Sequence, residues 1–370
     1  MPVEVSSVPE EAISSFIDVP YALNKNLKHW VPEPKSEVRA LLSPAHPFWK
    51  HGRRRLFIAR RNGVPAGCVA AIINDAHNRY YSDKCGFFGF FETADDAEVS
   101  SALLGAASAW LKEQGMDEVR GPMNPSTNES CGLLIDGFDS EPLLMMPYNP
   151  PYYAAHIENA GFAKVKDLLA FWRDAPPPLP ERVEKIIARA VERNKICLRP
   201  INLKKFDSEL AAIKDIYVHA WSENWGFVPV TDEEFSNIAK SFKPILKPEY
   251  VCMLEVDGKP AAFSFAAPDL NQAFAVTRGS LNPLNIIPFL LKLRSMNRGR
   301  LLMLGVKNEF RGKGLELVLI KQVIENSRKL GWTGGELSWI LEDNFKIINV
   351  MEAVGCRLYK RYRIYSRSPA

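Results

Sequence analysis

The stretch Leu301–Gly331 reads LLMLGVKNEFRGKGLELVLIKQVIENSRKLG. It opens with an apolar run, Leu301–Val306, which predicts a β-strand, and continues through a polar loop that contains Gly312 and Gly314. The remainder has apolar residues at helical spacing and predicts an amphipathic helix over 314–330. Glycines at a strand-to-helix turn leave backbone N–H groups exposed, and the helix N-terminus carries a partial positive charge. The stretch therefore predicts a phosphate or pyrophosphate site, with a plain glycine turn as the alternative.

The segments around this stretch predict an α/β (α+β) fold, with a mixed sheet flanked by helices on both faces. Upstream, the patterns predict a strand at 196–203, helices at 208–221 and 231–246, and a strand hairpin at 251–267. Downstream, they predict a strand at 336–341, a helix at 345–354 and a final strand at 358–366. Thr231 and Glu234 fit a capping box at the start of the second helix.

The chain repeats itself once. The hairpin 56–73, with Asn62-Gly63 at its turn, matches the hairpin 251–267, with Asp257-Gly258 at its turn. A second match, IENAGF ending at Phe162 and MEAVGC ending at Cys356, has nearly the same offset. The proline-rich stretch 173–182, RDAPPPLPER, predicts a stiff linker between the copies. We expect domains at 1–172 and 183–370.

Composition limits the functional classes. The chain has 370 residues, 46% hydrophobic and 24% charged, so it is long enough for two globular domains and is not a disordered chain. No apolar run is long enough for a transmembrane helix, and the polar N-terminus does not resemble a signal peptide. A net charge of +4 does not favour nucleic acid. Six cysteines without a CxxC pair predict buried, reduced thiols and no metal site in a cytoplasmic protein.

Two motifs resemble the GNAT acyltransferase superfamily. The phosphate loop of that family, R/Q-x-x-G-x-G/A, is similar to residues 311–316, RGKGLE. Its second signature, an Asn after the fifth strand and a helix that ends in Glu-x-x-Gly-Phe, is similar to Asn344, Glu352, Gly355 and Cys356. The resemblance implies two tandem GNAT-like folds, each with a mixed, mostly antiparallel twisted sheet, of a bacterial type that includes ceramide-synthase-like acyltransferases.

The resemblance also implies an acyl-CoA site in the second copy. Pyrophosphate would lie on the loop amides, and pantetheine would pair with the fourth strand where it diverges from the fifth. The implied cofactor residues are Leu304, Gly305, Val306, Arg311, Gly312, Lys313, Gly314, Leu315 and Asn344. Glu316 and Met351 depart from the family pattern, because Met351 stands where a tyrosine acid is frequent. The first copy has TADDAEVSSALLGAASAW at 93–110 in place of the loop, so we expect no CoA there.

Catalytic candidates are carboxylates and tyrosines of the second copy. Glu223 lies among aromatic residues in AWSENWGFVPVT (220–231), where apolar neighbours would raise its pKa and suit a general base, unless it is a helix-end Glu in water. Glu336 and Glu342, near the fifth strand, are further bases. Tyr362, or Tyr365, could replace the missing tyrosine acid.

Candidate substrate-binding residues come from two loops. The first, residues 121–153, combines amide and hydroxyl side chains with prolines, and could line a cleft at the domain interface or be an ordered loop that only packs. The second is the aromatic loop that carries Glu223. The candidates are Asn124, Asn128, Tyr148, Asn149, Tyr152, Asn224 and Trp225.

Two further segments leave alternatives open. The apolar, proline-broken segment 282–296 predicts an additional core helix, a wall for a long acyl chain or a shallow membrane foot. In the last strand, RLYKRYRIYSR, basic and aromatic residues alternate, which fits a solvated face with CoA or lipid-phosphate contact better than RNA binding.

The sequence as a whole favours an acyl-CoA-dependent N-acyltransferase that acts on a primary amine. The apolar segment and the basic face fit a long-chain acyl group and a sphingoid-type lipid amine, with weak peripheral contact at the inner face of the membrane. An acetyl-CoA-dependent acetyltransferase of a small amine is one alternative. A non-catalytic acyl-CoA-binding or sensor protein is the other.

Overall fold

A computed structural model describes residues 2–175, 177–280 and 282–369. The chain separates into two compact units. Unit 1 contains Met1–Leu168, Leu270–Arg294 and Lys360–Ala370, and unit 2 contains Leu169–Asp269 and Ser295–Tyr359. Two segments of the second half of the sequence therefore belong to unit 1, whereas the sequence predicts one boundary within 173–182.

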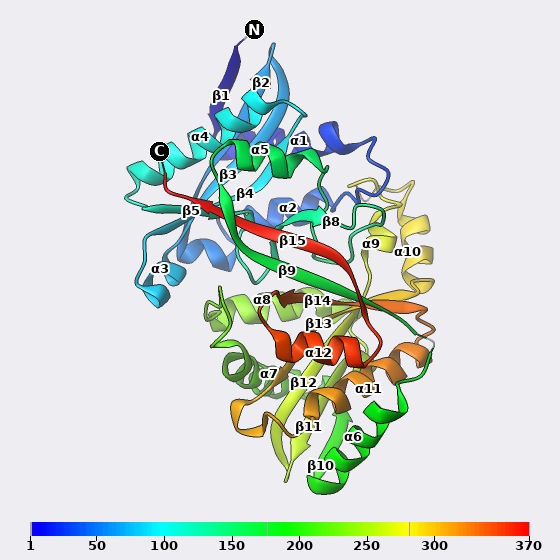
Figure 1. Cartoon of the computed structure of the whole chain (residues 1–370). Helices are drawn as coiled ribbons and strands as arrows, with labels where there is room; N and C mark the ends of the chain where they lie inside the picture. Colours follow the sequence, from blue (N-terminus) through cyan, green and yellow to red (C-terminus); the bar gives the residue numbers. More distant parts are fainter. Residues whose placement is uncertain (1, 176, 281, 370) are drawn as a thin grey trace. The chain divides into compact units, whose positions relative to one another are not determined.

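Unit 1 is a sheet in the order β1-β2-β3-β4-β5-β15-β9 with helices packed on it (Figure 1). Its strands are β1 (Val3–Val8), β2 (Gly52–Arg61), β3 (Val64–Asn74), β4 (Cys85–Thr93), β5 (Glu118–Gly121), β6 (Met123–Asn124), β7 (Ser130–Cys131) and β8 (Leu133–Asp136). The long strands β9 (Ala163–Asp174) and β15 (Arg357–Arg367) contribute residues to both units. Its helices are α1 (Ile13–Asn24), α2 (Lys35–Leu41), α3 (Asp75–Tyr81), α4 (Ala97–Glu113), α5 (Tyr152–Asn159), α9 (Asn271–Phe274) and α10 (Ile286–Arg294), with short turns η1 (Glu10–Ala12) and η2 (Pro47–Lys50).

Unit 2 repeats this plan with the sheet order β9-β14-β13-β12-β11-β10. Its own strands are β10 (Ile196–Pro200), β11 (Val251–Val256), β12 (Lys259–Pro268), β13 (Arg298–Val306) and β14 (Gly334–Leu341). Its helices are α6 (Glu181–Arg193), α7 (Phe206–Trp221), α8 (Asp232–Phe242), α11 (Leu315–Lys329) and α12 (Phe345–Ala353), with turns η3 (Leu203–Lys205), η4 (Lys243–Ile245), η5 (Pro248–Tyr250) and η6 (Asn308–Phe310). The predicted order of elements is confirmed, and their ends differ by a few residues.

The repeated hairpins are confirmed. Asn62 and Gly63 have φ values of 57° and 77°, and Asp257 and Gly258 have φ values of 50° and 74°. Both central residues of each turn are therefore left-handed, as a two-residue turn of type I′ requires. The predicted capping box is also present, since the side chains of Thr231 and Glu234 each bond to the other residue's backbone N–H.

Each unit contains a short parallel strand pair among its described residues. In unit 1, β4 pairs with β5 over Cys85–Phe87. In unit 2, β13 pairs with β14 over Arg298–Leu301, although β13 continues to Val306. Beyond these pairs the two strands diverge. The register of β12 against β13 shifts at the same level and skips Leu302, which forms a bulge.

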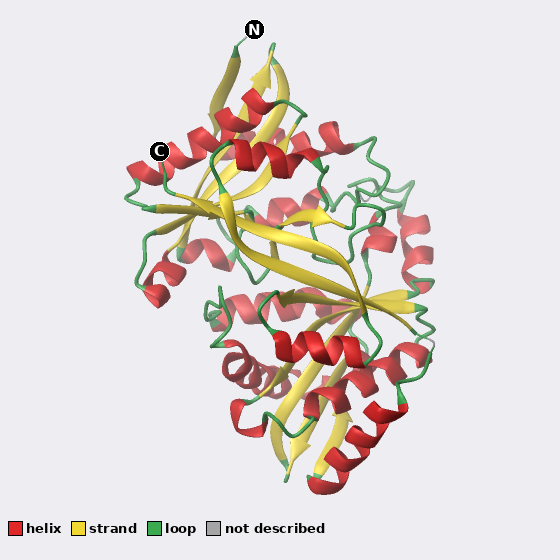
Figure 2. Ribbon diagram, viewed as in Figure 1, coloured by secondary structure: helices red, strands yellow, loops and turns green. Residues whose placement is uncertain are grey.

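Apolar side chains fill the space between sheet and helices in both units. In unit 2, Leu254 and Ala262 of the sheet pack with Ile187 of α6, Leu319 of α11 and Val354 after α12. Figure 2 shows that helices cover both faces of each sheet. Five of the six cysteines are buried and Cys197 is exposed, which confirms that most are packing residues.

The expectation of a core helix at 282–296 is wrong. The helix found there, α10, has no buried residue. It also belongs to unit 1, whereas the sequence places this segment between two strands of the second copy. An apolar composition predicts burial only if a complementary surface is at hand, which the sequence alone does not show.

Candidate active site

A buried polar cluster lies where β13 and β14 diverge. Arg300 of β13 stands directly opposite Glu336 of β14 in the parallel pair. Their exposed fractions are only 4% and 1%, and Arg300 Nε lies 3.4 Å from Glu336 Oε1. Ser338 joins them, because its hydroxyl accepts a 2.8 Å hydrogen bond from Arg300 Nε and donates to Glu336 Oε1. The guanidinium thus compensates a carboxylate charge that would be costly to bury alone.

Tyr359, at the start of β15, completes the cluster. Its hydroxyl donates to Glu336 Oε2, so both oxygens of this carboxylate have partners. The Tyr359 side chain is half-buried, and its ring makes an edge contact with the ring of Trp172 at 5.8 Å. The phenol can therefore reach a ligand from outside while it remains bonded to the buried carboxylate.

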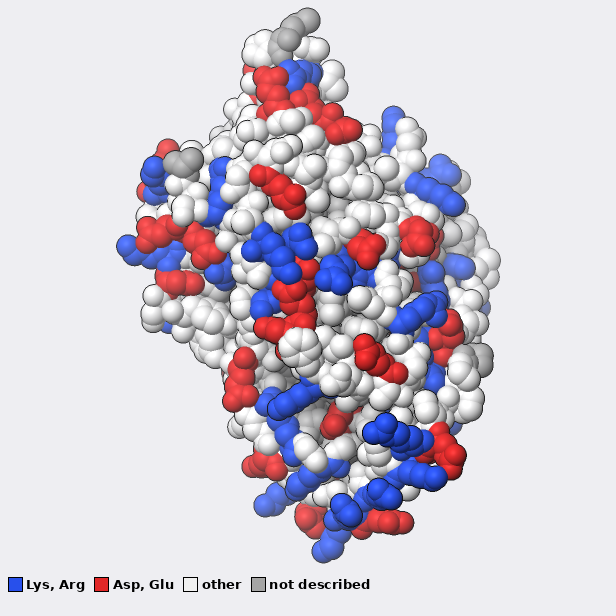
Figure 3. Space-filling model, viewed as in Figure 1, with Lys and Arg blue, Asp and Glu red and all other residues white. Residues whose placement is uncertain are grey.

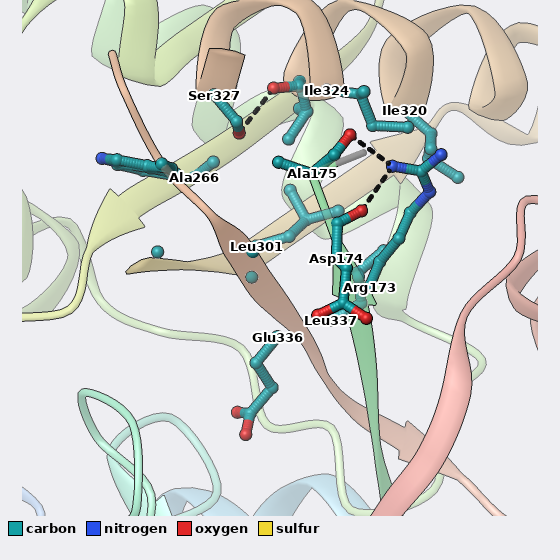
Figure 4. Close-up of a pocket in the computed structure, with 15 residues that line it drawn as sticks. Arg173, Asp174, Ala175, Ala266, Leu301, Ile320, Ile324, Ser327, Glu336 and Leu337 are labelled. Atoms are coloured by element: carbon teal, nitrogen blue, oxygen red, sulfur yellow. Dashed lines mark hydrogen bonds between the residues drawn. The ribbon is translucent and has the colours of Figure 1, made fainter. Parts of the chain in front are cut away.

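An apolar cavity of about 50 Å³ lies beside the same strand pair. Leu301, Ile320 and Ile324 line it, and Figure 4 shows these side chains grouped on the α11 side of the sheet. The Glu336 carboxylate points away from them in the same view. The point of divergence therefore has a polar side, at Glu336, and an apolar side, at Leu301.

The loop before α11 presents backbone N–H groups. Gly312 and Gly314 have φ values of 76° and 74°, which only glycine adopts at low cost. Gly314 is the N-cap residue of α11, so no side chain caps the helix. The loop residues 311–313 are exposed. This geometry fits the predicted anion site, because open N–H groups and the helix dipole face the same place.

Of the two environments that the sequence leaves open for Glu223, the structure shows the helix-end carboxylate in water and not the apolar one. Its side chain is 71% exposed, and Glu223 Oε2 lies 3.0 Å from Arg311 Nη1 in an ion pair. Arg311 also donates to the carbonyl of Ala220 at 2.8 Å. Glu223 and the Ala220 carbonyl thus hold Arg311 of the glycine loop against the end of α7.

Unit 1 closes the equivalent helix N-terminus with its own side chain. Asp96 caps α4 by accepting hydrogen bonds from the backbone N–H groups of Glu98, at 3.0 Å, and Val99, at 3.2 Å. Its other oxygen bonds to Arg61 Nη2 at 2.6 Å. A carboxylate of the chain itself therefore bonds the N–H groups at this helix N-terminus.

Unit 1 also fills the gap beyond its parallel pair. Asn124 Oδ1 accepts from Phe90 N at 2.6 Å. Tyr153 Oη accepts from Thr93 N at 2.9 Å, and Tyr152 Oη donates to Thr93 O at 3.0 Å. A Cβ on Gly89 would lie 1.6 Å from the carbonyl oxygen of Met123, so the chain itself occupies this space.

The corresponding edge of β13 in unit 2 differs. In the part of the chain that the structure describes, no side chain hydrogen-bonds to the backbone of residues 302–306. The predicted cofactor residues Leu304, Gly305 and Val306 lie here. A Cβ on Gly305 would meet the ring of Trp221 at 2.4 Å, so this glycine makes room for α7 rather than for a ligand.

The other predicted residues are placed as follows. Asn149 is buried and bonds to both backbone groups of Leu134, and Tyr148 donates to Phe138 O at 3.0 Å. Asn128 has its backbone N–H on Ser126 Oγ at 3.1 Å. Like Asn124 and Tyr152, the side chains of Asn149 and Tyr148 therefore bond to backbone groups of unit 1. Asn224 and Trp225 are half-buried in the loop after α7.

Three further predicted residues lie near the ends of strands. Asn344 Oδ1 caps α12 by accepting from Ile347 N at 3.3 Å. Lys313 lies over the ring of Phe310, and Leu315 is buried at the start of α11. Glu342 is half-buried just after β14 ends.

Tyr362, which the sequence offers as an acid, is a core residue. Tyr362 is fully buried and belongs to unit 1, as does Tyr365, whereas Glu336 belongs to unit 2. Gly132 packs against the Tyr362 side chain. Tyr359, which alternation along β15 places on the face opposite to Tyr362, is the phenol that reaches Glu336.

Sequence reasoning thus missed Arg300, Ser338 and Tyr359. One signal was available, since Glu336 and Ser338 are two residues apart on a predicted strand and must share a face. The partnership with Arg300 depends on strand register, which the sequence does not show.

The described residues were compared with the features of a metal site, a membrane span and a basic surface stripe. They contain no group of three or more His, Cys, Asp or Glu side chains placed to hold a metal. Among the same residues, no helix combines the length and apolar character of a membrane span. On the face shown in Figure 3, basic and acidic side chains are interspersed rather than gathered into a basic stripe.

Comparison with known proteins identifies relatives of the whole chain, although no family model matches it. The chain is 34% identical over 366 residues to Protein YghO of Escherichia coli (strain K12), covering 96% of this chain and 92% of the relative. It is 32% identical over 364 residues to the bacterial ceramide synthase of Caulobacter vibrioides, covering 96% and 94%.

Solved structures show the fold. A tandem GNAT protein from the clavulanic acid biosynthesis pathway matches with a TM-score of 0.59 and 14% identity, covering 100% of this chain and 99% of that one. A GCN5-related N-acetyltransferase from Sphaerobacter thermophilus matches with a TM-score of 0.56 and 12% identity, covering 99% and 95%. The chain therefore belongs to the same family as the bacterial ceramide synthase, and its fold is that of a tandem GNAT protein.

Proposed function

We propose that unit 2 transfers an acyl group from acyl-CoA to a primary amine, and that the amine is a sphingoid-type lipid that receives a long-chain acyl group. The observation that carries this proposal is the buried Glu336 carboxylate, bonded to the half-buried Tyr359 phenol at the point where β13 and β14 diverge. The 32% identity to a bacterial ceramide synthase supports the lipid amine as acceptor.

Acyl-CoA would lie along the open edge of β13. The backbone N–H groups of residues 312–315 would bind its pyrophosphate, and the backbone of Leu304–Val306 would pair with the pantetheine. Lys313 and Arg311 would add positive charge near the phosphates, and Asn344 would lie at the far side of the gap. The thioester would then reach the bulge at Leu302, close to Glu336.

The reaction needs one proton transfer from nitrogen. The amine attacks the thioester carbonyl, a C–N bond forms, and the backbone N–H at the Leu302 bulge stabilises the oxyanion. The nitrogen proton passes to Tyr359 Oη while the Tyr359 proton passes to Glu336. The C–S bond then breaks. CoA leaves as a thiolate, which needs little acid help because thiols ionise with a pKa of about 8.5, so Met351 is no obstacle.

The remaining candidates take lesser roles in this proposal. Asn224 and Trp225 would wall the acceptor side, and Glu342 lies outside the bonded cluster. Glu223 would act only through Arg311, by fixing the phosphate loop. Peripheral contact with the inner face of the membrane also belongs to the proposal, because both proposed substrates of the reaction are lipids.

One observation favours a second candidate. The apolar cavity beside Leu301 measures about 50 Å³, which suits a short acyl group better than a long chain unless its walls move. An acetyl-CoA-dependent acetyltransferase of a small amine would fit that volume. A non-catalytic acyl-CoA-binding or sensor protein would bind the same donor without turnover.

Release of free CoA distinguishes these functions. Purified protein is incubated with palmitoyl-CoA or acetyl-CoA, each with a sphingoid base or a small primary amine. Turnover with palmitoyl-CoA and the sphingoid base, at least tenfold above the other pairs, is expected. Preference for acetyl-CoA and the small amine would replace the lipid proposal by the second candidate. Binding of CoA without turnover of any pair would contradict catalysis.

A further inference from the structure

Helix α10 and the segment before it expose an unusual amount of apolar surface. Leu284, Ile287 and Leu291 are 89%, 64% and 60% exposed, and Leu290 is 50% exposed. Six of the fourteen large apolar side chains that are exposed among the described residues lie between Val276 and Leu291. Isolated exposed apolar residues are ordinary, but a cluster of this kind marks an interaction surface.

The stretch of sequence that contains α10 carries only positive charge. Residues 270–308 include six Lys or Arg and not a single Asp or Glu. Arg298, Arg300 and Lys307 pair with acids from elsewhere in unit 2. The other three, Arg278, Lys292 and Arg294, lie in unit 1 on either side of the apolar side chains, and both arginines are exposed.

Hydrogen bonds and a ring contact attach α10 and the segment before it to the rest of unit 1. Asn271 Nδ2 donates to Pro142 O at 2.9 Å, and the Gly279 carbonyl accepts from Lys35 N at 3.0 Å. Phe289 turns inward and stacks on Phe274 of α9, with ring centroids 6.1 Å apart. Asn285 Nδ2 bonds to Thr277 O at 3.1 Å and so ties the start of α10 to the loop below it.

These anchors leave the aliphatic side of α10 directed outward. If the helix could bury that side against unit 1, the hydrophobic effect would favour doing so, at about 25 cal/mol for each Å² removed from water. The helix instead buries none of its residues. The aliphatic side chains of α10 therefore remain exposed to solvent.

We propose that Leu284–Leu291, flanked by Arg278, Lys292 and Arg294, is a shallow docking surface for an anionic lipid bilayer. Nine helical residues are far too few to span a membrane, so the contact is interfacial. Aliphatic side chains would enter the boundary of the acyl chains, while the cationic side chains meet anionic headgroups. Protein interfaces are instead rich in aromatic residues, and none is exposed here.

This inference gives a location to the peripheral membrane contact of the proposed function, and it does not depend on acyl transfer. The two can therefore fail separately. Loss of vesicle binding would leave CoA release from soluble substrates unchanged, and loss of turnover would leave vesicle binding unchanged.

The test is co-sedimentation of the full chain with two kinds of vesicle. One contains phosphatidylcholine and phosphatidylglycerol, and the other contains phosphatidylcholine alone. The unsubstituted protein should bind the anionic vesicles at least tenfold more tightly. The triple variant L284S/I287S/L291S should lose at least tenfold in affinity, and R278S/R294S should lose at least fivefold and most of its dependence on salt.

A matched control replaces exposed apolar residues elsewhere. V64S/V191S/L203S removes side chains that are 65%, 47% and 39% exposed outside this surface, and should bind vesicles as the unsubstituted protein does. Melting temperatures of all variants verify folding. Equal vesicle affinity of the α10 variants and the control would overturn the proposal. So would sedimentation-velocity evidence that L284S/I287S/L291S dissociates a dimer while vesicle affinity is unchanged, because the surface would then serve a second copy.

Discussion

The two units share one fold and differ in the space beside one strand. In unit 1 the edge of β4 is occupied, since Asn124, Tyr152 and Tyr153 bond to its backbone beyond the parallel pair. In unit 2 the corresponding edge of β13 receives no side-chain hydrogen bond from the described residues. A repeated fold can thus keep or lose a ligand groove through a few side chains, without a change in its strands.

The helices that follow these strands, α4 in unit 1 and α11 in unit 2, differ at their N-termini. Asp96 caps α4, whereas Gly314 leaves α11 without a side-chain cap. A capping carboxylate satisfies N–H groups that an anion would otherwise bind, and it repels phosphate. The strand edge and the helix N-terminus therefore both receive side-chain hydrogen bonds in unit 1, and neither receives one from the described residues of unit 2.

The largest expected effect is on kcat, and it should distinguish Glu336 of unit 2 from Glu92 of unit 1. E336Q and Y359F should each lower kcat for CoA release by about a hundredfold or more, since general-base catalysis contributes roughly 10²–10⁴. Glu92 lies on β4 of unit 1, and its carboxylate accepts a 2.7 Å hydrogen bond from Tyr153 Oη. Its variant E92Q should leave kcat within about twofold at saturating donor. If E92Q and E336Q cost the same, the groove of unit 1 takes part in catalysis and the comparison fails.

A second prediction concerns the occupied edge of β4. N124A leaves the Phe90 N–H without its acceptor, so the free energy of unfolding should fall by about 2 kcal/mol. Chemical denaturation monitored by fluorescence measures this change. N159A, at an exposed position at the end of α5, is the control and should change it by less than about 0.5 kcal/mol.

N124A also tests what fills the groove. CoA binding should be the same in N124A as in the unsubstituted protein, because the Met123 backbone still lies against Gly89. A second CoA bound per chain, seen by calorimetry, would show that a single side chain closes unit 1.

The glycine loop gives the third prediction. G312A places a side chain at a φ of 76°, and the distorted loop should weaken CoA binding about tenfold, which corresponds to about 1.4 kcal/mol. G63A imposes the same strain at a φ of 77° in the hairpin of unit 1, where the space is equally open. Thermal shift with CoA should therefore decrease in G312A and not in G63A. Equal CoA affinity in both variants would remove the loop from the donor site.

The smallest expected effect is a pH dependence of stability. Burial raises the pKa of Glu92 to about 7 from its ordinary 4.5, although hydrogen bonds from Tyr153 and Asn24 oppose the rise. Between these values the folded chain holds more protons than the unfolded chain, so stability decreases as pH rises through this window and stays reduced above it.

E92Q should abolish this part of the pH dependence. Since Glu92 keeps some contact with water, the free energy of unfolding of E92Q relative to the unsubstituted chain should rise by about 1 kcal/mol from pH 5 to pH 8. Parallel stability curves across that range would show that Glu92 keeps an ordinary pKa.

Local signals in the sequence were sufficient for much of the fold. The turn residues Asn62-Gly63 and Asp257-Gly258 predict both hairpins, and Thr231 with Glu234 predicts a helix start, because each depends on neighbours in the chain. The glycine loop was found in the same way. Glu336 was named as a candidate base only because it lies near the fifth strand, and its burial became known from the structure.

The remaining features depend on contacts between distant segments. The sequence could not show that Arg300 stands opposite Glu336, that Tyr359 rather than Tyr362 reaches it, or that Arg311 pairs with Glu223. Each depends on strand register or on side-chain direction, and a shift of one residue would reverse the face of every side chain in a strand.

By itself, then, the sequence determined the repeated α/β plan, the family and the glycine loop before α11, since these are encoded in short-range patterns. Only the tertiary structure decided which polar groups are buried together, that unit 1 fills its own groove, and that α10 is exposed. The physical reason is that burial belongs to a surface assembled from several segments, so an apolar or charged residue acquires its role only when its neighbours are known.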